Sequence, residues 1–366
     1  MNLSIFSLIL SDNNSQTLHF YANNALSQQI AKKHRTIEKK RSFLLLFFLL
    51  ICLLSLIFDI MTGPSLLPFN EVWKALFQLG EIEETTKVIV YELRLPMAIM
   101  ALVVGAALGV GGAEIQTLLN NPMASPYTLG LAAAAGFGAS IVIAFGGFGL
   151  PTEISVPVGA FVMTLFSSAI LFAFSSLGRF SSAILVLVGI ALLFLFQSLL
   201  SLVQFISAPE VSQQILFWLF GNLTKATWQT ISIAFGVTTV CILLLFKDAW
   251  KLTALRLGEA RALSLGINLT WLRMKTLLIV SVMTATCISF VGIIGFIGLV
   301  APHIARMLLG EDQRFFLPGS MLVGTAFLSM SSVLSKSLVP GALFPVGIIT
   351  ALVGVPFFFW IVLAKR

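Results

Sequence analysis

Residues 291–310 carry the side chains of this sequence that are best suited to chemistry in an apolar setting. An apolar run leads there into Pro302, His303 and Arg306. An imidazole titrates near neutral pH, so it can carry a proton or bind a metal. Pro302 lacks a backbone donor and tends to kink or end a helix. The segment predicts an interrupted helix that ends in a basic group, a feature that suits a protein that moves material through a bilayer.

Two carboxylates also fall in apolar segments, where ionisable groups are costly and usually functional. Asp59 ends the first such segment, and Glu114 lies about one turn from the end of the second. We expect Glu114 to be a partly solvated or hydrogen-bonded group near the membrane surface. An ion-coupled secondary transporter usually needs several ionisable groups at mid-membrane. Since these two are the main candidates, that class of transporter is disfavoured but stays an alternative.

The sequence lacks the motifs with which a membrane protein would drive transport or catalyse a reaction by itself. It has no Gly-Lys dipeptide, and therefore no phosphate-binding loop of the Walker A type. It has no H-E-x-x-H motif and no Cys/His cluster, and Cys52, Cys241 and Cys287 each lie within apolar sequence. We therefore expect no catalytic residue, no metal site and no cofactor, and we expect the energy for its work to come from a partner.

The composition places most of the chain in lipid. Of the 366 residues, 58% are hydrophobic and only 10% are charged, whereas soluble domains carry about 25% charged residues. Apolar runs of about 20 residues recur from residue 43 onward, which is the length that a helix needs to cross a bilayer. Alternating patterns of the β-barrel kind are absent. The predicted fold class is an all-α polytopic membrane protein.

Ten membrane-spanning helices are predicted, of which the first covers residues 42–60. The others lie at about 95–119, 127–146, 157–178, 183–206, 227–247, 274–293, 294–309, 317–335 and 344–364. The segment 211–222 is too short to span and predicts a surface helix. The boundary between the seventh and eighth spans is the least defined, because apolar sequence runs almost unbroken from Met274.

Basic residues predict the orientation of these spans. A polar tail, residues 1–42, ends in the basic run 32–41, and no small-residue cleavage site follows the first apolar core, so we expect that core to be retained. Alternating the spans from a cytoplasmic N-terminus places seventeen Lys and Arg inside and five outside. Cytoplasmic loops are the basic ones in membrane proteins. Both termini are therefore predicted to be cytoplasmic, with 1–42 as a tail and 43–366 as the membrane domain.

Glycines and one amide predict close helix packing in the second span. Gly105, Gly109 and Gly112 lie on one helix face and let another helix approach closely in lipid. Gln116, near the inner end of the same helix, is a neutral polar group that can bridge two helices.

The inner loop 255–273 contains a short amphipathic segment, residues 259–265, between two glycines. It is too polar to span a bilayer. It is either an ordinary solvated connector or a helix that docks onto a cytoplasmic partner.

Four ordered blocks resemble the FecCD/BtuC family, the permease subunits of ABC importers for iron–siderophore complexes, haem and vitamin B12. The blocks are RLP…GAALGVGGAEIQ…NPMASPYTLG, LGEARALSLG, GFIGLVAPHIARMLLGEDQRFFLPGS and FPVGIITALVGVPFFFWIVL, and the resemblance covers about residues 43–366. It implies a BtuC-like type II permease fold of ten helices, with two permease subunits, identical or paralogous, around one path. It also implies two cytoplasmic ATPase subunits and a periplasmic or lipid-anchored substrate-binding protein as partners.

The resemblance implies roles for particular residues in this chain. The segment that couples to the ATPase corresponds to Gly258, Glu259, Ala260, Arg261, Leu265 and Gly266. Basic positions that dock the binding protein correspond to Arg94 and Lys336. Ser181 and Ser182 fall where the family has its inner gate. His303 is then expected to have a structural or ATPase-facing role near the cytoplasmic side.

The sequence departs from the family at three outer positions. Met97 replaces an Arg, Ser332 replaces an Asp, and Leu343 replaces an acidic residue. The outer docking surface is therefore expected to be less charged than is usual in the family.

The function predicted from this resemblance is a permease subunit of an ATP-driven importer that moves ferric siderophore across the inner membrane. Import of vitamin B12 or haem by the same mechanism is the alternative within the family. We expect contacts with membrane lipid and none with nucleic acid, and we expect ATP hydrolysis on a separate subunit.

Overall fold

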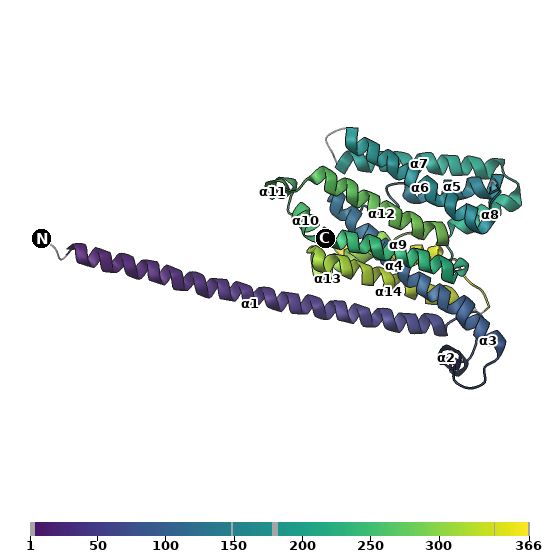
Figure 1. Cartoon of the computed structure of the whole chain (residues 1–366), viewed down its shortest axis with the longest axis horizontal. Helices are drawn as coiled ribbons and strands as arrows, with labels where there is room; N and C mark the ends of the chain where they lie inside the picture. The colour runs from purple at the N-terminus through teal and green to yellow at the C-terminus, as the bar shows by residue number, and fades with distance from the viewer. Residues whose placement is uncertain (1–3, 148, 178–181, 340, 365–366) are drawn as a thin grey trace. The chain divides into compact units, whose positions relative to one another are not determined.

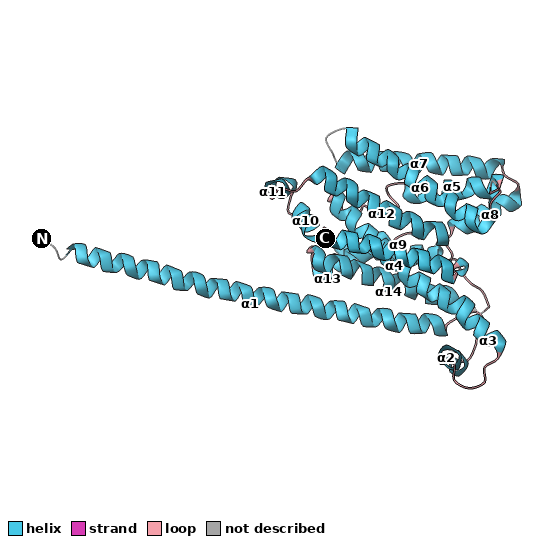
Figure 2. Ribbon diagram, viewed as in Figure 1, coloured by secondary structure: helices cyan, strands magenta, loops and turns pink. Residues whose placement is uncertain are grey.

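The computed structural model describes residues 4–147, 149–177, 182–339 and 341–364. Within these ranges the chain forms helices and turns and no strand, as Figures 1 and 2 show. Seven helices are long and apolar enough to cross a membrane, and three further apolar helices are shorter. The predicted all-α class and the prediction of about ten spans are thereby confirmed.

The helices follow the predicted spans closely. In chain order they are α1 (Ser4–Met61), α2 (Phe69–Phe77), α3 (Glu84–Val88), α4 (Leu95–Leu119), α5 (Leu131–Phe145), α6 (Thr152–Leu177), α7 (Ser182–Ile206), α8 (Pro209–Leu219), α9 (Trp228–Lys247), α10 (Ala249–Arg256), α11 (Glu259–Ser264), α12 (Leu269–Val291), α13 (Ile297–Leu309), α14 (Gln313–Ser337) and α15 (Val346–Ala364). A π-helical turn, η1 (Ile89–Arg94), joins α3 to α4, and a 3₁₀ turn, η2 (Leu223–Lys225), precedes α9. The short helix expected at 211–222 is α8.

The chain divides into two compact units, Met1–Leu46 and Phe47–Arg366. Helix α1 runs through the boundary, so the helical conformation begins well before residue 42, where the first span was predicted to start. The larger unit contains every other helix and all the features described below.

Helix α4 is the centre of the larger unit. Nearly all of its side chains are buried, and it packs against α9, α12, α13 and α14. A Cβ added at Gly105 or Gly109 would clash with the backbone of α14, and one added at Gly112 would clash with the backbone of α13 at Gly298. The glycine face predicted from the sequence therefore brings helix backbones into direct contact, as small residues do in membranes. Helices α5, α6, α7 and α8 form a neighbouring group (Figure 1).

The interruption predicted near Pro302 lies elsewhere. Pro302 is inside α13, and the break is the non-helical segment 292–296 between α12 and α13. Gly292 has a φ of 77° and Phe296 a φ of 67°, a left-handed conformation that ends or starts a helix without continuing it. The break contains no polar residue that would mark it in the sequence, because its side chains are apolar and pack within the larger unit or line the cavity described below.

Candidate functional site

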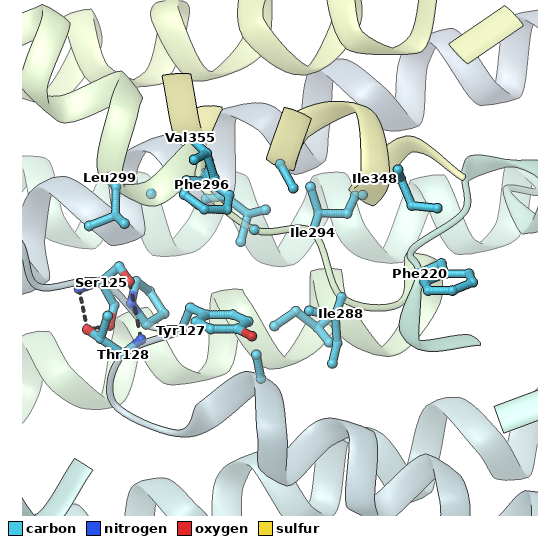
Figure 3. Close-up of a pocket in the computed structure, with 18 of the residues that line it drawn as sticks. Ser125, Tyr127, Thr128, Phe220, Ile288, Ile294, Phe296, Leu299, Ile348 and Val355 are labelled. Atoms are coloured by element: carbon cyan, nitrogen blue, oxygen red, sulfur yellow. Dashed lines mark hydrogen bonds between the residues drawn. The ribbon is translucent and has the colours of Figure 1, made fainter. Parts of the chain in front are cut away.

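A cavity of about 810 Å³ lies beside the break between α12 and α13. Its wall is formed by the turn between α4 and α5, the break itself, and one face of α15, as Figure 3 shows. Most of the lining is aliphatic or aromatic, and Ser125, Tyr127, Thr128 and Thr284 contribute the hydroxyl groups. The volume lies in the range of cavities that hold small-molecule ligands, about 300–1,000 Å³. The geometry suits a bulky ligand held by shape more than by specific hydrogen bonds.

Backbone contacts fix the shape of the break that forms one wall. The N–H of Asn222 donates to the carbonyl of Val291 at 2.7 Å, which ties the end of α12 to the turn after α8. A Cβ at Gly292 or Gly221 would clash with this crossing, and one at Gly347 of α15 would clash with the carbonyl of Phe220. Three segments thus meet at glycines, and a larger side chain at any of these three positions would not fit.

Paired hydroxyls fix the opposite wall, the turn between α4 and α5. The N–H of Ser125 donates to Thr128 Oγ1 at 2.9 Å, and the N–H of Thr128 donates to Ser125 Oγ at 3.2 Å. These reciprocal bonds, dashed in Figure 3, close the turn that follows the Asn121-Pro122 helix break. The neighbouring Tyr127 lines the cavity from this turn.

The predicted coupling segment, residues 258–266, forms helix α11 and its two flanking turns. Gly258 (φ 111°) and Gly266 (φ 74°) have left-handed backbones, which favour glycine, so both ends of the helix turn sharply. Ala262 is buried against Leu252 and Leu255 of α10, whereas Glu259, Ala260, Arg261 and Leu265 are exposed, so the segment is anchored by one residue and presents the others outward. Leu257, Leu263 and Leu265 are each more than half exposed. A solvated connector rarely gathers leucines in this way, so the geometry favours the docking interpretation.

One ion pair holds this segment to α12, and a second carboxylate links the helices beside it. Glu259 accepts a hydrogen bond from Arg273 of α12 at 2.5 Å. Asp248, between α9 and α10, binds both Lys251, at 2.8 Å, and Lys275 of α12. Burial by itself would raise the pKa of Asp248, but the hydrogen bonds and positive charges of these two lysines outweigh it, and the pKa lies below its ordinary value. Asp248 is therefore a charged clamp between α9, α10 and α12.

The two predicted docking residues, Arg94 and Lys336, lie inside the chain, each 3% exposed. Lys336 donates to the Asp59 carboxylate at 2.8 Å and to the Asp59 carbonyl at 3.1 Å. Arg94 donates to the Met61 carbonyl at 2.8 Å and to Ser65 Oγ at 3.0 Å. The structure thus brings both residues together around the last turn of α1.

The other predicted residues lie apart from this group. Ser181, one of the two inner gate candidates, is outside the described residues, and Ser182 is the half-buried first residue of α7. His303 lies half-buried in α13, one turn before Arg306. Among the described residues, no three His, Cys, Asp or Glu side chains are placed to hold a metal ion.

Glu114 differs from its prediction. It is fully buried, and neither carboxylate oxygen has a hydrogen-bond partner among the described residues, so the expectation of a solvated or bonded interfacial group is wrong. Three-residue spacing puts Glu114 on the side of α4 shared with Gly111, whose neighbours are Val280, Met283 and Thr284 of α12. Glu114 therefore lies on a face of α4 that packs against another helix. Its position near the end of an apolar run could not show whether it faces that helix or the membrane surface.

A polar cluster at the end of α4 was only partly predicted. Gln116, expected to bridge helices, does so: it accepts a hydrogen bond from Arg306 of α13 at 2.8 Å. Glu311, between α13 and α14, forms ion pairs with Arg306 and with Arg256 of α10. Arg256 lies 55 residues from Glu311 in the sequence, so no local pattern indicates that they meet.

Comparison with known proteins gives one family for nearly the whole chain. A sequence model of the FecCD transport family matches residues 49–364. The hemin transport system permease protein HmuU of Yersinia pestis is 36% identical over 277 residues, which is 75% of this chain and 83% of that protein. The vitamin B12 import system permease protein BtuC of Vibrio vulnificus is 30% identical over 348 residues, which is 93% of this chain and 98% of that protein.

A solved structure shares the fold. It is an inward-facing conformation of an ABC transporter assigned to the metal-chelate type, and it superimposes with a TM-score of 0.77 at 28% identity. The match covers 88% of this chain and 99% of that one. The arrangement of helices around α4 is therefore that of a BtuC-like permease.

Proposed function

Because this chain belongs to the FecCD transport family, we propose that it is the permease subunit of an ATP-driven importer that carries ferric siderophore across the bacterial inner membrane. The observation that carries the proposal is the family match over 49–364, together with an apolar cavity large enough for a chelate beside a broken helix. Broken helices near a cavity are a common arrangement in transporters. The termini are proposed to be cytoplasmic, as the distribution of basic residues predicts.

The cavity is proposed to form part of the cargo path, completed by a second permease subunit that is identical or paralogous. Its wall offers shape and few hydrogen bonds, so bound cargo would be held weakly. Weak binding suits a path, since a site that binds tightly releases slowly.

Two ATPase subunits are proposed, one for each permease subunit, and the one bound to this chain is proposed to dock at α11 and its flanking turns. The exposed leucines at 257, 263 and 265 supply apolar area, and Arg261 supplies a charge at the same surface. Since Ala262 is buried against α10, movement of the docked ATPase would be passed to the helices of the membrane domain. ATP binding and hydrolysis would then select between inward-open and outward-open states.

Arg94 and Lys336 remain our proposal for docking of the binding protein, and Ser181 and Ser182 for the inner gate. The two basic side chains are buried, so they would act by holding the end of α1 against η1 and α14 in the shape that the binding protein recognises.

Uptake by the complete complex in proteoliposomes tests the proposed function. The complex that copurifies with a tagged form of this chain would be supplied with ATP and, in separate samples, a radio-iron siderophore, haem and cyanocobalamin. We expect vanadate-sensitive uptake of the siderophore without any ion gradient. Uptake of haem or cyanocobalamin alone would replace the cargo assignment, and gradient-driven uptake by this chain without an ATPase would support a secondary transporter instead.

A further inference from the structure

Pro302 leaves one backbone carbonyl of α13 without its helical partner. In an α-helix the N–H of residue 302 would donate to the carbonyl of residue 298, and proline has no N–H. The side-chain amide of Gln116 takes that place, since its Nε2 donates to the Gly298 carbonyl at 3.4 Å. Gly298 also lines the cavity. A side chain of α4 is therefore bonded directly to the cavity wall.

The same amide continues into a chain of charged contacts. Gln116 Oε1 accepts from Arg306 Nη2 at 2.8 Å, and Arg306 Nε lies 3.3 Å from Glu311 Oε1. That oxygen also pairs with Arg256 Nη2. Glu311 thus bridges two arginines that would otherwise repel each other, and it links Arg256 of α10 to Arg306 of α13.

Arg256 ends the chain at the proposed ATPase-docking segment. It is the last residue of α10, two positions before Gly258, and Leu252 and Leu255 of the same helix pack on Ala262 of α11. The guanidinium also donates to Asn120 at the end of α4, at 2.8 Å. The side chains of Arg256 and Arg306 are 10% and 15% exposed, so water and salt screen their contacts only partly.

We propose that the contacts Arg256–Glu311–Arg306–Gln116–Gly298 carry the movement of the docking segment to the cavity wall, and that Glu311 and Gln116 are positioning residues for transport. The inference rests on the proposed function. Ion pairs and hydrogen bonds to a side-chain amide are either formed or broken. Such contacts can therefore couple two sites through an element with two discrete arrangements. The proline makes the link possible, because it frees a carbonyl on the cavity side without ending the helix.

The test is the number of cargo molecules imported per ATP hydrolysed by the reconstituted complex, with radio-iron siderophore as the cargo. Glu311→Gln removes the charge that bridges the arginines, and Gln116→Met removes both amide contacts at similar volume. Each is expected to lower this ratio about threefold or more while the ATPase still copurifies and hydrolyses ATP. The double variant should fall no further than the lower single one, because both changes cut the same chain of contacts.

Two further variants keep the result specific. Glu311→Asp keeps the charge and should restore most of the ratio. Glu84→Gln removes a carboxylate from the exposed Glu84–Lys87 pair before α4 and should leave the ratio unchanged. If Gln116→Met fails to fold, Arg256→Gln, at the other end of the chain of contacts, replaces it in the double variant.

An unchanged ratio in Glu311→Gln, or effects of the two variants that multiply, would overturn the inference while leaving the proposed function intact. A wild-type complex that hydrolyses ATP but imports no radio-iron siderophore would overturn both.

Discussion

Lys336 and Asp59 form a buried ion pair, and single and double variants separate the effect of breaking the pair from the effect of removing both charges. Their side chains are 1% and 0% exposed, so Lys336→Met leaves a buried carboxylate without its cation. We expect this variant to lower the free energy of unfolding by about 3–5 kcal/mol, seen as a lower thermal midpoint in detergent. Asp59→Leu combined with Lys336→Met should recover most of the loss, because neither charge is then left alone.

The double variant also tests the docking proposal. If Lys336 acts only by holding α1 to α14, the refolded double variant should bind the substrate-binding protein with an affinity within a few fold of the parent. Loss of binding in a variant of parental stability would mean that the charge itself is recognised. A single variant as stable as the parent would contradict the burial argument.

Substitution of Glu114 is expected to stabilise the chain, in contrast to the loss of stability expected for Lys336→Met. Both of its oxygens are buried without a hydrogen-bond partner among the described residues, and such a group costs about 1–3 kcal/mol. Glu114→Met should therefore raise the thermal midpoint of the detergent-solubilised protein. Gln116→Met, two residues away, is the matched control and should lower it, since it leaves the Gly298 carbonyl and Arg306 without their partner. A decrease in both would contradict the argument that the buried Glu114 carboxyl group lowers the stability of this chain.

For single residues, the sequence predicted the role of a side chain better than it predicted which side chains that residue contacts. The bridging role of Gln116 followed from its place near the end of an apolar helix. The pattern of residues 258–266 predicted a short amphipathic helix between two glycines, and its coupling role, which only the family resemblance implied, stays a prediction. The burial of Arg94 and Lys336 did not follow, because their partners on α1 lie 33 and 277 residues away in the sequence.

Among the elements, α9, α10 and α12 depend on a single carboxylate. The pKa of Asp248 lies below its ordinary value because two lysines outweigh the effect of burial. A group with a lowered folded pKa contributes stability at pH values above its unfolded pKa, about 3.9, and loses it as the pH falls through the folded value. We expect the contribution of the Asp248 clamp to be constant between about pH 7 and 5.

Asp248→Asn provides the measurement for this clamp. The amide leaves Lys251 and Lys275 facing each other, so the thermal midpoint at neutral pH should fall, and the difference between variant and parent should shrink as the pH falls from about 5 through the lowered folded pKa of Asp248. Lys74→Gln, which removes an exposed cation on α2, is the control. A difference that persists unchanged in acid would assign the effect to packing and not to charge.

The elements that the sequence predicted well are those with long apolar runs. The predicted spans fall within a few residues of the helices because lipid requires about 20 apolar residues for each. The missed elements, α2, α3 and α10, are short. Helix α2 does carry an amphipathic pattern, with Val72 and Ala75 buried on one face, whereas α3 and α10 have too few residues or too mixed a composition to stand out from loops. The break at 292–296 falls at the predicted boundary between the spans 274–293 and 294–309. The interruption expected at Pro302 is absent, because Gln116 donates to the carbonyl that the proline leaves free and α13 continues through it.

For the whole molecule, the proposed assembly with an ATPase gives a direct test. Leu263→Asp places a carboxylate at the centre of the exposed leucines of the docking segment, where desolvation on binding is costly. We expect the ATPase that copurifies with the chain to fall about tenfold or more, with unchanged yield of the membrane-inserted protein. Leu79→Asp, an equally exposed leucine after α2, should leave copurification unchanged. Equal recovery of the ATPase with both variants would place its docking site elsewhere.

The sequence predicted the class of the molecule and its family from composition and from four ordered blocks. It could not predict the cavity, because the wall is assembled from a turn, a helix break and α15, which are distant in the chain and share only apolar character.

The cavity wall has a consequence for selectivity. Its described lining contains no Asp, Glu, Lys, Arg or His, so chelates of equal size but different charge meet the same apolar surface, and the wall offers little to tell them apart. Discrimination is a difference between two affinities, and a surface that contributes little to either contributes little to the difference. If the cavity is the proposed cargo path, the permease would accept chelates that differ in charge, and the choice of what is imported would rest with the protein that presents the cargo to it.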